Sequence, residues 1–133
     1  MRQIQQLSQV LGRVIAAVIG LKGSGQTQQA IEITNKALNE ELKLDIDALL
    51  EMKPEEMLQF LEEKEGMNEE NLERVADLFL ELGKKMKEEQ IQPEKMKVFF
   101  RRALQIYTYI EGQGNIYSID RNHKIQKLNE MLE

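Results

Sequence analysis

The side chains best suited to bind a charged ligand lie in the last third of the 133-residue chain. Arginine and aromatic residues are enriched where proteins contact partners, and a guanidinium group can hold a phosphate or carboxylate through two parallel hydrogen bonds. The sequence therefore predicts a ligand- or partner-binding site formed by Arg101, Arg102, Tyr109, Tyr117 and His123. The alternative is that neighbouring Tyr107 belongs to the core and that Arg102 pairs with acidic residues at the surface.

Residue types needed for many kinds of catalysis are absent. The chain has no Cys and a single His, which excludes disulfides, thiolate zinc sites, a Cys nucleophile and sites with several His ligands. A di-metal helical bundle needs Glu three residues before His, but Asp120 stands three residues before His123. The sequence predicts a protein that is not an enzyme, with no catalytic residue, no metal site and no cofactor.

One glycine-rich segment partly matches a phosphate-binding loop. Gly20, Gly25 and Thr27 have the right spacing, but Gln26 stands where that loop needs its Lys. The Lys supplies the main charge for the phosphates, and the segment follows a predicted helix rather than a strand. We interpret it as a turn between two helices.

The net charge of −5 is distributed unevenly. Residues 1–44 carry a net +2, residues 45–94 a net −10, and residues 95–133 a net +3. These zones can attract one another, either within one fold or between chains. The alternative is that they are solvated helix faces, because single ion pairs at the surface contribute little to stability. The overall negative charge argues against nucleic-acid binding.

Apolar residues recur at steps of three and four, which predicts helices along the whole chain. The expected ranges are about 2–21, 27–44, 46–52, 54–65, 69–89, 93–111 and 118–132. Asp45 and Asn68 are expected N-caps, Pro54 and Pro93 suit first turns, and the segment Gly112-Gln113-Gly114 is expected to break a helix. We predict one all-α domain, residues 1–133, with about six or seven helices.

The first helix has more apolar residues than one shallow contact needs. Ile15 and Ile19 widen its main stripe. This helix is therefore expected either at the centre of the bundle or at the interface of a homodimer. The predicted dimer interface consists of Leu7, Leu11, Val14 and Val18.

Two stretches resemble the helical hairpins of tetratricopeptide repeats. Residues 25–38, with Ala30 and Ala37, are similar to the turn and second helix of that repeat. Residues 75–107 resemble both helices of a hairpin, through Phe79, Leu82, Gly83, Met86, Phe100 and Ala103. This match needs about one inserted residue near Gln90, and Met96 stands where the family prefers Ala. Small residues such as Gly83 let antiparallel helices approach closely, and large ones such as Phe100 fill the gaps.

The resemblance implies antiparallel hairpins in a bundle or α-α superhelix, with residues 45–66 as an insertion between them. The chain also resembles small bacterial all-helical proteins. Together with the missing catalytic groups, the tetratricopeptide resemblance implies a scaffold or interaction module for a protein or peptide partner. The alternative is a small-ligand or anion-binding protein that uses the late Arg and Tyr residues.

No membrane span or targeting segment is expected. The longest apolar run, residues 14–21, has eight residues, whereas a spanning helix needs about 20. The absence of Cys is compatible with a reducing compartment. We therefore expect a cytoplasmic protein without nucleic-acid or membrane partners.

Overall fold

The computed structural model describes residues 2–21, 25–113 and 117–133. Over these residues the chain forms seven α-helices and one π-helical segment, without strands. The helices are α1 (Arg2–Gly20), α2 (Gln26–Ala37), the π-helical η1 (Leu38–Leu42), α3 (Ile46–Glu51), α4 (Pro54–Glu62), α5 (Glu69–Glu89), α6 (Pro93–Gln113) and α7 (Ile119–Leu132). The prediction of an all-α fold with about six or seven helices is confirmed.

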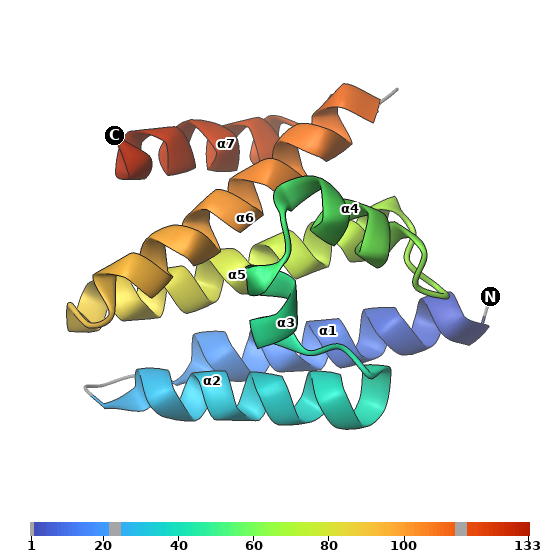
Figure 1. Cartoon of the computed structure of the whole chain (residues 1–133), viewed down its shortest axis with the longest axis horizontal. Coiled ribbons are helices and arrows are strands. Elements are labelled where there is room, and N and C mark those ends of the chain that lie inside the picture. Colours follow the sequence, from blue (N-terminus) through green and yellow to red (C-terminus); the bar gives the residue numbers. More distant parts are fainter. Residues whose placement is uncertain (1, 22–24, 114–116) are drawn as a thin grey trace.

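Two antiparallel helix pairs form the body of the molecule (Figure 1). The pair α1–α2 lies beside the pair α5–α6, and α5 lies between α1 and α6. The short helices α3 and α4 contact α6, and α7 crosses α6 on the far side from α1. Because α5 touches α1, α2 and α6, it holds the two pairs together.

The pair α5–α6 packs closely at one glycine. A Cβ atom placed on Gly83 would lie 2.5 Å from Cε1 of Phe100. Gly83 is buried, and Phe100 is fully buried. The same two helices also meet through the rings of Phe79 and Phe99, whose centroids are 5.6 Å apart. The expected roles of Gly83 in close approach and of Phe100 in filling the gap are confirmed.

The predicted helix starts agree with the caps in the structure. The side chain of Asp45 accepts a hydrogen bond from Ala48 N at 3.3 Å, and that of Asn68 accepts one from Asn71 N at 2.9 Å. Pro54 begins α4 as expected. These caps could be predicted because donor and acceptor lie within four residues of each other.

A buried amide joins the beginning of α1 to the α4–α5 turn. Asn71 Nδ2 donates to the carbonyl oxygens of Ile4, at 3.1 Å, and Gly66, at 2.9 Å. Gly66 has φ 84°, and a Cβ there would lie 2.4 Å from the carbonyl oxygen of Gln3. The turn therefore packs directly against the backbone of α1.

Three local expectations differ from the structure. The helix expected over residues 27–44 is α-helical only to Ala37, is π-helical to Leu42, and ends where Lys43 has φ 55°. Helix α4 ends at Glu62, before Gly66. Helix α6 runs to Gln113, so it ends inside the expected breaking segment 112–114 but two residues beyond the expected end at Glu111. Residues 22–24 and 114–116 of the expected turns lie outside the described residues.

The predicted dimer-interface residues are part of the core of one chain. Leu7, Leu11, Val14 and Val18 are at most 4% exposed. Helix α1 needs a wide apolar stripe because it packs on α2, η1 and α5 at once. Those four side chains are therefore not available to a second copy, and the homodimer itself stays a prediction.

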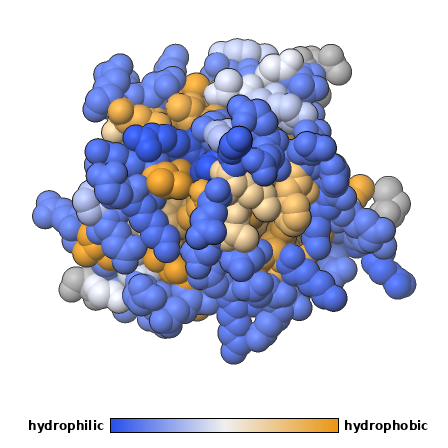
Figure 2. All heavy atoms as spheres, viewed as in Figure 1, coloured by the Kyte–Doolittle hydropathy of each residue, from blue (hydrophilic) through white to orange (hydrophobic). Residues whose placement is uncertain are grey.

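The face seen in Figure 2 is mostly hydrophilic, with apolar side chains in scattered patches. Large apolar side chains that are well exposed in the described ranges are Ile19, Phe60, Tyr117 and Ile119. None of the helices in the described part of the chain has the length and apolar character needed to cross a bilayer.

Candidate functional site

The five residues of the predicted late Arg and Tyr site do not come together. Arg101 is exposed on α6. Arg102 is only 9% exposed, and its Nη2 donates to the carbonyl oxygen of Leu50 at 3.2 Å and to that of Met52. Arg102 thus attaches the end of α3 to α6, rather than pairing with acids at the surface. Burial lowers the pKa of its guanidinium, and the charge of Glu55 opposes that shift.

The remaining three predicted residues lie on different parts of the surface. Tyr109 donates to Oε1 of Glu62 at 2.6 Å, a hydrogen bond that raises the pKa of the phenol and joins α6 to α4. Tyr117 is 70% exposed, and His123 is exposed on α7. Tyr107 lies in the core, as the alternative interpretation expected.

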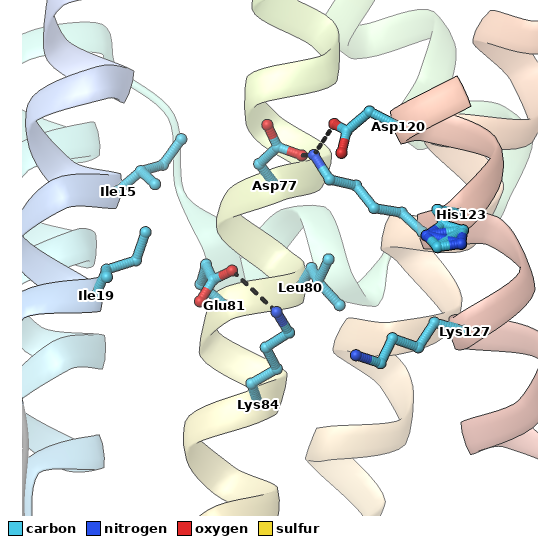
Figure 3. Close-up of a pocket in the computed structure, with 10 residues that line it drawn as sticks. Ile15, Ile19, Asp77, Leu80, Glu81, Lys84, Asp120, His123 and Lys127 are labelled. Carbon is cyan, nitrogen blue, oxygen red and sulfur yellow. Dashed lines mark hydrogen bonds and ion pairs between the residues drawn. The ribbon is translucent and has the colours of Figure 1, made fainter. Parts of the chain in front are cut away.

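A groove of about 340 Å³ lies between α1, α5 and α7. We call it the α1–α5–α7 groove. Figure 3 shows α5 as its floor, with α1 on one side and α7 on the other. Its lining residues are Ile15, Ile19, Asp77, Leu80, Glu81, Lys84, Asp120, His123, Lys124 and Lys127. Of the five predicted site residues, only His123 belongs to this groove.

The lining follows from helical periodicity on each wall. Residues 77, 80, 81 and 84 form one stripe of α5, and residues 120, 123, 124 and 127 form one stripe of α7. Positions three and four apart share a helix face, so each helix presents one stripe to the groove. Ile15 and Ile19, four residues apart, do the same on α1.

The acidic side chains of the groove already have lysine partners. Lys124 Nζ lies 2.9 Å from Oδ1 of Asp77 and 3.1 Å from Oδ2 of Asp120. Burial alone lowers the pKa of Lys124, but its bonds to the two carboxylates outweigh this and raise it. On α5, Lys84 Nζ lies 3.4 Å from Oε2 of Glu81.

Two side chains on the α7 wall of the groove have no such partner. His123 and Lys127, one helical turn apart on α7, make no ion pair or hydrogen bond with any other side chain that the structure describes. Figure 3 shows Lys127 extending from α7 toward the floor. Across the groove, Ile19 is 52% exposed on α1. The two walls therefore differ in character, since one is apolar and the other cationic.

Ion pairs attach α7 to the α5–α6 pair and so position the cationic wall. Arg121 is 5% exposed, with Nη1 at 2.6 Å from Oε1 of Glu73 and Nε at 2.5 Å from Oε1 of Glu111. Helix α7 also makes apolar contacts, because Leu128 is fully buried and Ile125, Met131 and Leu132 are partly buried against the core. Ion pairs and apolar packing therefore both attach α7.

Asp77 connects the groove to the core. Its Oδ1 accepts hydrogen bonds from Lys124 and from the phenol of Tyr107, and Lys124 Nζ lies 5.7 Å from the centre of the Tyr107 ring. Burial and the neighbouring Asp77 carboxylate raise the pKa of Tyr107 strongly. The phenol thus stays protonated and acts as a donor that holds Asp77 in place.

These pairs place part of the predicted charge attraction within the fold. Arg121 and Lys124 of the basic last zone contact Glu73 and Asp77 of the acidic middle zone. Lys95 makes a longer pair of the same kind with Asp47, at 3.7 Å. In the described residues, no group of three or more acidic or His side chains is placed to hold a metal ion.

Comparison of the chain with models of protein families, with curated proteins and with solved structures found no match.

Proposed function

We propose that this chain is a non-enzymatic interaction module that holds a helical segment of a partner protein in the α1–α5–α7 groove. The observation that carries the proposal is the open groove with the half-exposed side chain of Ile19 on one wall. Grooves between helices are a common docking place for the apolar face of a partner helix. An exposed Ile beside a groove gains free energy when a partner removes it from water.

The tetratricopeptide-like arrangement is part of the same proposal. In this interpretation α1–α2 and α5–α6 are two hairpins, α7 covers the end of the second hairpin, and α3 and α4 are the insertion. The first helices of both hairpins then line the groove together with α7. A bacterial source and a cytoplasmic location belong to the proposal too, and the absence of Cys supports the location.

The alternative of anion binding by the late Arg and Tyr residues has less support. Arg102 already donates to the end of α3, and Tyr109 already donates to Glu62. Arg101 and Tyr117 are exposed, without a shared hollow among the described pockets. We therefore place the binding function in the groove.

Selection from a random peptide display library tests the proposal without knowledge of the natural partner. We expect enriched peptides to bind the protein and to lose binding to the variant Ile19→Glu. The matched control is Phe60→Glu, because Phe60 is 44% exposed on α4 and does not line the groove. Enrichment of no peptide, or equal loss of binding in both variants, would refute the use of the groove.

A further inference from the structure

We infer that the partner segment is an acidic amphipathic helix, whose apolar side chains contact Ile15 and Ile19 and whose carboxylates face His123 and Lys127. This inference rests on the proposed function and adds the chemistry of the partner. It follows from the charges already paired in the groove, from the difference between its walls, and from the space beside α1.

The lining of the groove has three carboxylates and three lysines, so its net charge favours neither sign of partner. The pairing of these charges favours an acidic partner over a basic one. A basic segment would have to compete with Lys124 for Asp77 and Asp120, or with Lys84 for Glu81. An acidic segment instead meets Lys127, which has no ion-pair partner among the described residues, and His123, whose imidazole can donate a hydrogen bond to a carboxylate. It would gain new pairs without breaking the ones that hold α7.

The arrangement of the walls determines the pattern of the partner. Because the apolar and cationic walls lie on opposite sides of α5 (Figure 3), a single helix that fills the groove must carry its apolar and acidic stripes on different faces. Ile15 and Ile19 are one turn apart, as are His123 and Lys127. The contact therefore covers about one to two turns of the partner, or roughly 5–10 Å of helix.

The surface of α1 next to the groove leaves room for a close approach. Gly12 and Ala16 are exposed, one turn apart, and a Cβ atom at Gly12 would meet nothing within 4 Å. Helices that meet at small residues can pack at the short end of the usual 8–10 Å range between axes. A partner helix that contacts Ile15 and Ile19 can therefore also lie against the backbone of α1.

The test compares three synthetic helical peptides of the same length, in which Leu recurs at steps of three and four. The other positions hold Ala and either Glu, Gln or Lys. Fluorescence anisotropy of the labelled peptides, at low salt, gives their affinities for the full chain. We expect the Glu peptide to bind about tenfold more tightly than the Lys peptide, with the Gln peptide between them, and the difference to shrink as salt screens the charges.

A pair of matched variants locates the effect in the groove. Lys127→Glu is expected to weaken binding of the Glu peptide about three- to tenfold, whereas Lys97→Glu, an equal change of charge at an exposed position outside the groove, leaves it within about twofold. Far-UV circular dichroism checks that both variants remain folded. An equal effect of the two variants would overturn the inference.

The outcomes separate this inference from the proposed function. If Ile19→Glu abolishes binding but the Lys or Gln peptide binds best, the groove is the binding site and the inferred partner chemistry is wrong. If no peptide binds up to about millimolar concentration and library selection also fails, the proposed function is wrong as well. If the protein forms dimers that Ile19→Glu dissociates, a second copy occupies the groove, and an acidic partner helix is excluded.

Discussion

Replacing Gly83 with Ala tests how closely α5 and α6 approach each other. The new Cβ would lie 2.5 Å from Cε1 and 2.7 Å from Cδ1 of Phe100. Carbon atoms in ordinary contact are about 3.5–4.0 Å apart, so the ring or the helices must move by about 1 Å. Phe100 is fully buried, and its ring has no open space into which it can turn without disturbing other core residues.

Two opposing contributions determine the size of the effect. Ala in a helix interior is favoured over Gly by about 1 kcal/mol, whereas overpacking a core costs about 1–3 kcal/mol. We therefore expect Gly83→Ala to lower the free energy of unfolding by up to about 2 kcal/mol. Gly12, exposed on α1 with nothing within 4 Å of a new Cβ, provides the matched control.

The control isolates the steric effect because both variants gain the same helix propensity. Gly12→Ala should stabilise the protein by about 0.5–1 kcal/mol, so the two variants should differ by about 1–3 kcal/mol. Urea unfolding followed by far-UV circular dichroism measures this difference. In a double-mutant cycle, Phe100→Leu should relieve part of the clash, so that the double variant is more stable than additivity predicts. If Gly83→Ala stabilises as much as Gly12→Ala, the close packing is refuted.

Two further predictions concern the attachment of α7 and the buried phenol. Arg121→Ala leaves Glu73 without this partner and should lower the free energy of unfolding by about 2 kcal/mol. His123→Ala, on the exposed side of α7, should change it by less than about 0.5 kcal/mol. Equal effects of the two variants in urea unfolding would contradict the role of Arg121 in attaching α7. Because burial and Asp77 raise the pKa of Tyr107 above its value of about 10 in the unfolded chain, its contribution to stability is present below about pH 10 and is lost as the pH rises further. Tyr107→Phe should therefore show a smaller loss of stability between about pH 9 and pH 11 than the unchanged protein, and identical slopes would argue against this role.

The helices could be predicted because their signals are local. The caps at Asp45 and Asn68, the proline that begins α4, and the apolar stripes of α1 and α5 all depend on residues within a few positions of one another. The close contact at Gly83 could also be predicted, since a glycine in the middle of an apolar helix face leaves space for a neighbouring helix. The π-helical end of α2 had no comparable signal.

The groove could not be predicted because it depends on the relative positions of three helices. The helical spacing places Val18 in the main apolar stripe of α1 and Ile19 at its edge, but it cannot show whether another helix covers that edge. In the fold Val18 is buried and Ile19 is half exposed. The N-terminus of α2 shows the same limit, because its cap is Glu89 at the distant end of α5, which accepts from Gln26 N at 2.8 Å and Thr27 N at 3.3 Å. The same spacing of apolar residues suits a core, a dimer or a binding groove.

The uneven charge of the chain explains why the fold and the proposed binding surface depend on the same helix. Arg121 and Lys124 on α7 form ion pairs with acidic residues of α5 and α6, and these pairs position α7. Lys127, which lines the groove one turn beyond Lys124, has no ion-pair partner among the described residues and can bind a carboxylate of another molecule. Since the same ions screen both kinds of pair, rising salt should weaken the binding of an acidic helix and the attachment of α7 together. A partner bound across α1 and α7 would in turn strengthen that attachment, because it binds only when α7 is in place.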